Sequence, residues 1–192
     1  MIGIDEVGRG CWAGPLLIVA ARPKAGLPVG LKDSKKLSAK QREKLYPLII
    51  ESCDLGEGWV EPEEIDSIGL AQAMILGVQR ALDNIQPTNA EEVIMDGDIN
   101  YVSKIPAHSS LNSRAVIKAD DEYPIVSAAS IYAKVKRDEY MSKASLEFPG
   151  YGFEKHVGYG TSQHLKAMQA LGVVKLHRLS FKHVKQMLIN RV

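Results

Sequence analysis

Four acidic side chains stand at or just beyond the ends of short apolar segments, namely Asp5, Glu6, Asp96 and Asp120. In an open α/β sheet the strand ends converge on one crevice, so acids that are remote along the chain can meet there. Carboxylates that converge without a basic partner repel one another, and they stay ionised only if a cation neutralises them. Oxygen ligands without Cys or His at ligand spacing indicate Mg²⁺ or Mn²⁺ rather than Zn²⁺. Two such ions, about 4 Å apart, form a site that cleaves phosphodiesters.

Each of these acids also has an ordinary explanation when it is taken alone, because an Asp at a strand end commonly caps a turn. Asp5 and Glu6 are adjacent, and adjacent side chains point to opposite faces of a regular strand. Both of them reach one site only if the strand bends or ends there.

Hydrophobic periodicity predicts strands and helices that alternate around these acids. Strands are expected at 2–7, 16–22, 54–62, within 91–98 and at 114–120. Helices are expected from residue 39 onward and at 70–85, 126–148, 161–172 and 182–189. Ser38 can cap the first helix, and Pro47 should kink or end it because proline lacks the amide proton. Strands and helices mixed in this order indicate the α/β class.

Composition fits one domain of an ordinary globular protein. The chain has 192 residues, of which 45% are hydrophobic and 24% are charged, and this length can bury a real core. No apolar run approaches the roughly 18 residues that cross a bilayer, and the N-terminus lacks the pattern of a signal peptide. With only Cys11 and Cys53, no disulfide framework is expected. We therefore expect a cytoplasmic protein with reduced thiols.

Charge is distributed unevenly, although the net charge is only +1. Residues 51–98 carry twelve acids and one base, whereas residues 155–192 carry seven Lys or Arg and no acid. A second basic cluster lies at 31–44. Such asymmetry can mark a face that binds a polyanion, and solvated helix faces explain it equally well.

Six segments resemble the ribonuclease HII family in order and spacing: GIDEVGRG followed by CWAGP, LKDSKKLS, IMDG, VIKADDEYPIVSAASIYAKVKRD, YGFEKHVGYGT and HRLSF. The resemblance spans nearly the whole chain. It implies a ribonuclease H-like fold, with a mixed central β-sheet flanked by helices and a helical C-terminal region over about residues 160–192, in a single catalytic domain over 1–192. The implied activity is endonucleolytic cleavage of RNA in RNA–DNA hybrids, including single ribonucleotides embedded in duplex DNA. The four catalytic and metal-binding carboxylates of that family match Asp5, Glu6, Asp96 and Asp120.

Two of these acids have a neighbouring rival. Asp96 is preferred to Asp98 because it directly follows the apolar strand. Asp120 is preferred to Asp121 because it keeps the family's spacing to Lys118.

The chain also departs from the family pattern at two positions. Ala119 stands where the family usually has Gly, and Val157 stands where it usually has Lys. The second change removes one positive charge near the substrate tyrosine.

The resemblance also implies a substrate-binding set. Gly8, Arg9 and Gly10 match an element that recognises the ribonucleotide, in which backbone amides approach the sugar–phosphate closely and the guanidinium grips a phosphate. As a bare triplet, Gly-Arg-Gly is a weak signal that a plain turn would also explain. Tyr159 matches a tyrosine that packs on the deoxyribose that follows the ribonucleotide. The predicted phosphate contacts are Lys35, Lys36 and Arg178.

These inferences predict an endonuclease that uses two Mn²⁺ or Mg²⁺ ions, with substrate bound, to cut the phosphate 5′ to a ribonucleotide, leaving a 3′-hydroxyl and a 5′-phosphate. We expect a monomer without an organic cofactor or a membrane interaction. Ribonuclease HIII is one rival, but that sister family carries an extra N-terminal domain, for which four residues before Asp5 leave no room. A non-catalytic nucleic-acid-binding module is the other rival, and converging acids argue against it because a binder of polyanions gains nothing from them.

Overall fold

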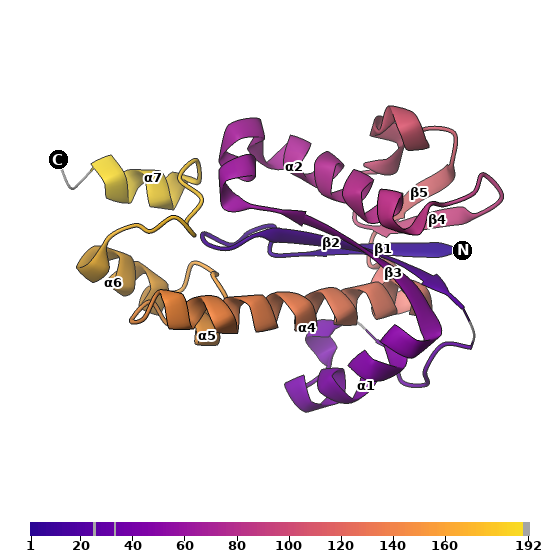
Figure 1. Ribbon diagram of the computed structural model, residues 1–192, viewed down its shortest axis with the longest axis horizontal. Helices are drawn as coiled ribbons and strands as arrows, with labels where there is room; N and C mark the ends of the chain where they lie inside the picture. Colours follow the sequence, from indigo (N-terminus) through magenta and orange to yellow (C-terminus); the bar gives the residue numbers. More distant parts are fainter. Residues whose placement is uncertain (25, 33, 190–192) are drawn as a thin grey trace. The chain divides into compact units, whose positions relative to one another are not determined.

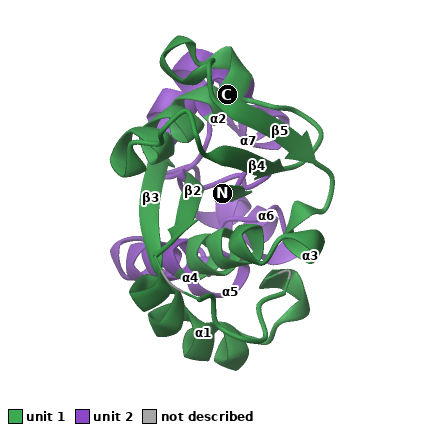
Figure 2. Cartoon of the chain, turned by 90° about the vertical axis from the view of Figure 1, so that its right-hand side faces the viewer, with its two compact units in different colours: residues 1–7, 17–59, 74–135 green, residues 8–16, 60–73, 136–192 purple. Residues whose placement is uncertain are grey.

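The computed structural model describes residues 1–24, 26–32 and 34–189, and it divides into two compact units. Unit 1 comprises residues 1–7, 17–59 and 74–135, and unit 2 comprises residues 8–16, 60–73 and 136–192, coloured separately in Figure 2. The prediction of one domain over 1–192 stays a prediction. Residues 190–192, which belong to the predicted C-terminal helical region, lie outside the described residues.

Unit 1 is built on a mixed five-stranded sheet with the order β3-β2-β1-β4-β5 (Figure 1). The strands are β1 Ile2–Val7, β2 Leu16–Pro23, β3 Cys53–Val60, β4 Glu92–Asp96 and β5 Asn112–Val116. β1 pairs antiparallel with β2 and parallel with β4, and β4 pairs parallel with β5. The mixed sheet of the predicted α/β, ribonuclease H-like fold is therefore confirmed.

Helices cover both faces of this sheet. Leu17, Val19 and Ala21 of β2 pack in one buried cluster with residues of α1 (Ala39–Ser52) and α4 (Pro124–Glu147). On the other face, a Cβ on Gly77 of α2 (Pro62–Ile85) would lie 2.2 Å from Ile18 Cδ1, so helix and strand are in close contact there. Figure 1 shows α2 on one side of the sheet, with α1 and the start of α4 on the other.

Two helix boundaries differ from the sequence expectation. Helix α1 carries the predicted Ser38 cap as a full capping box with Gln41. Of the two effects predicted for Pro47, a kink or an end, the second does not occur, because the helix continues through Pro47 to Ser52. Helix α2 starts at Pro62 rather than near residue 70, with a break at Gly69, where φ is 76°. Pro62 and the two acids after it are favourable in a first helical turn, a signal that the periodicity alone does not reveal.

The segment around Asp120 also differs from the prediction. Strand β5 ends at Val116, and Asp120 lies in a one-turn helix, α3 (Ala119–Glu122). Short 3₁₀ turns complete the connections: η1 Ser34–Lys36, η2 Val102–Lys104 and η3 Pro106–His108.

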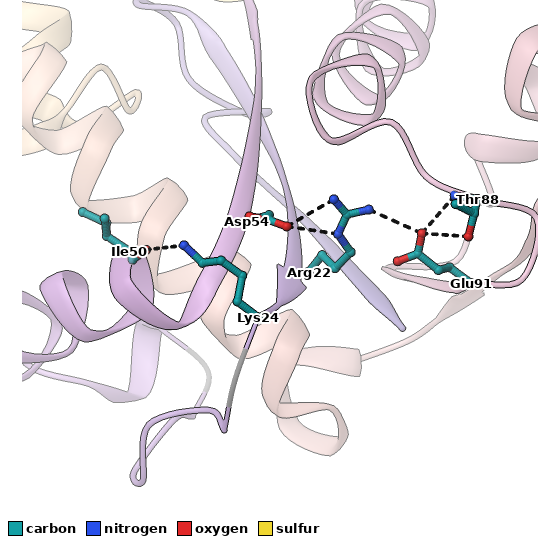
Figure 3. Close-up of polar contacts among 6 residues, drawn as sticks. All are labelled: Arg22, Lys24, Ile50, Asp54, Thr88 and Glu91. Carbon is teal, nitrogen blue, oxygen red and sulfur yellow. Dashed lines mark hydrogen bonds and ion pairs between the residues drawn. The ribbon is translucent and has the colours of Figure 1, made fainter.

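An ion-pair network joins three segments of unit 1 (Figure 3). Arg22 of β2 donates to Asp54 of β3 at 3.1 Å and to Glu91, just before β4, at 3.4 Å. Glu91 also accepts hydrogen bonds from the amide and hydroxyl of Thr88, and these bonds lower its pKa. All three ionic groups keep some solvent exposure, so the network contributes modestly to stability.

Unit 2 contains the predicted helical C-terminal region in α5 (Phe153–His156), α6 (Ser162–Leu171) and α7 (Lys182–Ile189). Helix α6 begins at its Thr161 cap and ends at Gly172, where φ is 93°, as predicted. The core of the unit packs Ala13 with Met141, Tyr151, Phe153 and Leu176. Among the described residues, no helix combines the length and apolarity that crossing a membrane requires.

Candidate active site

Asp5 and Asp96 are brought together by the pairing of β1 with β4. The parallel register pairs Gly3 with Ile94 and Ile4 with Met95, so the next residues along the two strands are Asp5 and Asp96. Neighbours in a parallel sheet point to the same face. That face is the one covered by α4, because a Cβ on Gly3, two residues before Asp5, would touch the α4 backbone at Val126 N. Two acids that stand 91 positions apart in the sequence therefore share one strand end.

The Asp5 carboxyl is buried, with 7% of the residue exposed. Its Oδ1 accepts a hydrogen bond from the Glu6 amide at 2.7 Å, and the nearby Ser130 hydroxyl of α4 also favours its charged form. Burial raises the pKa of Asp5 well above its ordinary value, and the charges of Glu6 and Asp96 raise it further. Two further acids therefore crowd negative charge around the Asp5 carboxyl.

Asp120 is tied to the same place through its backbone. Asp96 Oδ1 accepts a hydrogen bond from Ala119 N at 2.8 Å, and Ser127 Oγ donates to the Asp120 carbonyl at 2.6 Å. Asp120 is buried, with 5% exposed. The left-handed residue of this turn is Lys118, with φ 61°, so the Ala that replaces the family's Gly at 119 meets no backbone conflict.

The two rival acids are placed differently. Asp121 is exposed and pairs with Lys36 Nζ at 2.5 Å, whereas Asp98 is exposed beyond the end of β4. These placements support the preference for Asp96 and Asp120 as the site acids.

Glu6 lies on the opposite face of β1 from Asp5. It pairs with Ile18 on the face covered by α2, as strand alternation requires, and its side chain is half-buried. In residues 1–24, 26–32 and 34–189, no three His, Cys, Asp or Glu side chains converge closely enough to hold a metal ion. Mutually repelling carboxylates stay apart until a cation draws them together, so a metal site here requires side chains to rotate toward the ion.

The Gly-Arg-Gly segment belongs to unit 2 and begins a loop over residues 8–16. Gly8 has φ 87°, and a Cβ there would lie 2.2 Å from Arg137 Nε, so no other residue fits without displacing that guanidinium. Arg137 is fully buried and donates to the carbonyls of Ala13, Pro15 and Val157. Arg9 and Gly10 themselves are exposed, as a contact with substrate demands.

Arg178 does not lie where a phosphate contact must lie. Its side chain is fully buried, and it donates twice to the Gly14 carbonyl, at 2.8 and 3.0 Å, and once to the Arg9 carbonyl at 3.0 Å. Burial lowers its pKa to about 10, which leaves it charged at neutral pH. The structure thus corrects the predicted role of Arg178: it holds the loop that carries Arg9, and it cannot reach a substrate phosphate.

Tyr159 is exposed, with 41% of the residue accessible, on a loop joined to residues 8–16 by backbone bonds. Trp12 N and Ala13 N both donate to the carbonyl of Gly158, at 2.8 and 3.3 Å. Val157 has φ 43°, a strained value for a β-branched residue. All predicted substrate contacts of unit 2 therefore belong to one hydrogen-bonded assembly.

The predicted phosphate contacts of unit 1 are Lys35 and Lys36, and both are exposed on η1. Ser34, which precedes them, is buried and is hydrogen-bonded at 2.8 Å to Ser130, the serine whose hydroxyl lowers the pKa of Asp5. The lysines are thus anchored next to the acids.

Sequence reasoning missed the buried histidines of unit 2. His156, His164 and His177 are each less than 8% exposed. His156 and His164 stand among aromatic and Gly residues in FEKHVGYGTSQH, but this pattern does not say which of them is buried.

Comparison with known proteins places the chain in a family. The family model described as Ribonuclease HII matches residues 2–184. A curated protein named Ribonuclease HII from Jannaschia sp. (strain CCS1) is 40% identical over 189 residues, covering 97% of this chain and 91% of that protein. The structure of the PCNA:RNase HII complex from Archaeoglobus fulgidus superimposes with a TM-score of 0.80 at 28% identity, covering 94% of each chain. The crystal structure of ribonuclease H2 from Pyrococcus horikoshii OT3 superimposes with a TM-score of 0.76 at 27% identity, covering 98% of this chain and 97% of that one. The chain therefore belongs to the ribonuclease HII family of hydrolases.

Proposed function

We propose that this chain is an endoribonuclease that cleaves the RNA strand of RNA–DNA hybrids and cuts 5′ to single ribonucleotides embedded in duplex DNA. The products are a 3′-hydroxyl and a 5′-phosphate. The observation that carries the proposal is the parallel register of β1 and β4, which puts Asp5 and Asp96 side by side at a strand end. Asp120 is held beside them through the bond from Ala119 to Asp96.

The residues that would hold divalent ions are Asp5, Glu6, Asp96 and Asp120. The donors fit Mn²⁺ or Mg²⁺, because all of them are carboxylates and hard cations prefer oxygen ligands. The raised pKa of Asp5 supports the fit, since burial and the neighbouring acids crowd negative charge that a cation would relieve. When two ions are bound with substrate, they activate the attacking water and stabilise the leaving oxygen.

The protein itself contributes by positioning the carboxyl groups. The Glu6 amide holds the Asp5 carboxyl, and the Ala119 amide holds that of Asp96. These two carboxyls lose little freedom when substrate arrives, whereas Glu6, on the other face of β1, has to rotate toward the ions.

Recognition of the ribonucleotide is assigned to the loop that follows β1. The backbone of Gly8 and Gly10 can approach a sugar closely, and the 2′-hydroxyl, which both donates and accepts hydrogen bonds, distinguishes RNA from DNA. The exposed guanidinium of Arg9 binds a phosphate. The exposed ring of Tyr159 packs on the deoxyribose that follows the ribonucleotide, where an added 2′-hydroxyl would be excluded. Lys35 and Lys36 contact the phosphate backbone.

A duplex with one embedded ribonucleotide, labelled at the 5′ end of the ribonucleotide-containing strand, tests the proposal. The purified protein, which we propose acts as a monomer without an organic cofactor, is incubated with EDTA, Mg²⁺ or Mn²⁺. We expect cutting only with a divalent ion, at the bond 5′ to the ribonucleotide, with a product that a polymerase can extend. Binding without cutting in either ion would instead identify a non-catalytic nucleic-acid-binding module, and a cyclic phosphate end would refute hydrolysis by water.

A further inference from the structure

A buried chain of two histidines leads from residue 174 to Tyr159 in unit 2. Val174 N donates to His177 Nδ1 at 3.0 Å, His177 Nε2 lies 3.1 Å from His164 Nε2, and His164 Nδ1 lies 3.0 Å from the Tyr159 carbonyl. His164 and His177 are 0% and 1% exposed. Neither histidine has a role in the function proposed above.

The hydrogen bonds allow one assignment of protons. His177 Nδ1 lies 3.0 Å from the Val174 amide nitrogen and 3.2 Å from the Val174 carbonyl oxygen, so the assignment starts from the other end of the chain. His164 Nδ1 faces the Tyr159 carbonyl, which can only accept, so a neutral His164 carries its proton on Nδ1 and accepts at Nε2. A neutral His177 then carries its proton on Nε2, and its Nδ1 accepts from the Val174 amide. The reverse order would set His164 Nδ1 and the Tyr159 oxygen against each other as two acceptors, and it would leave the Val174 amide without an acceptor on the ring.

Both rings are neutral in this arrangement, and their surroundings favour that state. Burial lowers the pKa of His164 and of His177 to about 4. A charged His177 would have to protonate Nδ1, which would exchange the bond from the Val174 amide for a bond to the Val174 carbonyl, 3.2 Å away. His156, stacked on His164 with ring centroids 4.5 Å apart, is held in the same way, between the Tyr151 carbonyl and the Gly158 amide.

We propose that His164 and His177 are positioning residues for Tyr159, and that this pair of neutral imidazoles fixes the loop whose tyrosine reads the sugar next to the ribonucleotide. The proposal rests on the role assigned to Tyr159 under the proposed function. The Tyr159 carbonyl also accepts a bond from Thr161 N at 2.8 Å. The bond from His164 ties this carbonyl to a buried ring, while the neighbouring carbonyls of Val157 and Gly158 are held by Arg137 and by the amides of Trp12 and Ala13. A ring that must pack on one sugar is sensitive to small shifts of its backbone.

The test compares His164→Leu, which removes both ring nitrogens, with His164→Asn, whose amide can still donate to the Tyr159 carbonyl. The readout is junction preference, defined as the ratio of kcat/KM on a duplex with one ribonucleotide to kcat/KM on a continuous RNA–DNA hybrid. We expect His164→Leu to lower this ratio about tenfold or more and His164→Asn to retain most of it. His108→Gln, a histidine of unit 1 that pairs with Asp83, is the matched control and should leave the ratio unchanged.

Repeating the test in a protein that carries Tyr159→Ala separates this inference from the proposed function. If His164 acts through Tyr159, then His164→Leu should have no further effect on junction preference in a Tyr159→Ala protein. Loss of preference in Tyr159→Ala but not in His164→Leu would overturn the inference and leave the role of Tyr159 intact. If the wild-type protein shows no junction preference, the assigned role of Tyr159 fails, and the positioning role of the histidines fails with it.

Histidine ring NMR of the wild-type protein tests the proton assignment without any variant. Long-range ¹H–¹⁵N spectra at pH 7 should show His164 as the neutral Nδ1–H tautomer and His177 as the neutral Nε2–H tautomer. A charged ring at pH 7, or the opposite tautomer for either residue, would refute this proton assignment.

The same pair predicts a loss of stability in acid. Each folded-state pKa, about 4, is below the ordinary value of 6.5, so the native state binds fewer protons than the unfolded state between these values. The stability contributed by the neutral rings is present above pH 6.5 and is lost as the pH falls through 4. We expect the Tm of the wild-type protein to fall over this range, and His164→Asn to flatten the fall; an unchanged pH profile would contradict it. The ionisable groups near the pair are His156, Tyr151, Arg178, Glu63, Asp66 and Lys175.

Discussion

Asp5→Asn should abolish cleavage while making the protein more heat-stable in the absence of divalent ions. Asn keeps the size of Asp and can still accept the Glu6 amide bond, so the fold should tolerate it. It removes one of the carboxylates that would hold a catalytic ion. Because metal ions supply several kcal/mol of transition-state stabilisation, the rate should fall by at least about 10³-fold. Binding of a ribonucleotide-containing duplex, measured by fluorescence anisotropy, should change little.

The gain in stability follows from the charge that the wild-type protein buries. Burial, Glu6 and Asp96 raise the pKa of Asp5 in the folded state above its ordinary value of 3.8. The native state therefore holds this proton more tightly than the unfolded state does, and stability falls as the pH rises from 3.8 through the raised pKa. Asn carries no charge at any pH. The Tm advantage of Asp5→Asn should therefore be small in acid and grow toward pH 8, by about 2–4 °C for each kcal/mol gained.

Divalent ions should reverse the order of the two Tm values, so that the wild-type protein becomes more stable than Asp5→Asn. Mn²⁺ or Mg²⁺ bound to the native state stabilises it by mass action, so the wild-type Tm should rise on titration while that of Asp5→Asn rises much less. Asp98→Asn is the matched control, because Asp98 is an exposed acid two residues beyond Asp96, the last residue of β4, and it should behave as wild type in all three measurements. Turnover retained by Asp5→Asn, or a lower Tm than wild type in EDTA, would refute the assignment of Asp5.

The nearness of Asp5 and Asp96 could be predicted because two simple rules converge on them, while the catalytic roles of the four acids stay a prediction. Apolar runs that end in an acid mark where strands stop, and parallel strands stop at a common edge. What the sequence does not contain is the register, which pairs Gly3 with Ile94 and so sets Asp5 beside Asp96. The alternation of Asp5 and Glu6 was foreseen as a difficulty, and the structure shows it: β1 stays regular through Val7, and Glu6 lies on the other face.

The helices show which local signals suffice. Ser38 and Thr161 cap helices as predicted, because a cap depends on residues within one turn. The expected strand over 114–120 was too long, since the left-handed turn at Lys118 and the bond from Ala119 to Asp96 redirect the chain after Val116. That bond joins residues 23 positions apart, and no local pattern encodes it.

The buried bases could not be predicted at all. His177 and Arg178 stand in the segment LHRLSF, which has Lys175 before it and Lys182 after it. This context suits an exposed basic segment. Their burial depends on partners that lie far away in the chain, such as the carbonyls of Arg9 and Gly14. An arginine is expected at the surface unless it is paired. The partners of Arg178 are backbone oxygens, and backbone oxygens, unlike acidic side chains, cannot be recognised in a sequence.

Arg178→Met should lower both stability and activity, because the buried guanidinium closes the loop that carries Arg9. Without it, the carbonyls of Gly14 and Arg9 lose their donors, and each unsatisfied buried group costs about 1–3 kcal/mol. Stacking of the guanidinium on Phe181, 5.2 Å away, is lost as well. With both carbonyls affected, the Tm should fall by roughly 5–15 °C. Cleavage should fall about 100-fold, since the loop no longer holds Arg9 in place.

Salt dependence distinguishes this role from the phosphate contact that the sequence predicted. Loss of a phosphate contact reduces the slope of log K against log salt by about 1, and Arg9→Met should show that reduction with an unchanged Tm. Arg178→Met should leave the slope intact and lower the Tm, and Arg178→Lys should resemble Arg178→Met, because one ammonium cannot replace the fork that bonds two carbonyls. Arg114→Met, at an exposed arginine paired with Glu92, controls for loss of charge. If Arg178→Lys keeps wild-type stability while the slope falls in Arg178→Met, the guanidinium binds phosphate and the loop is held by other contacts.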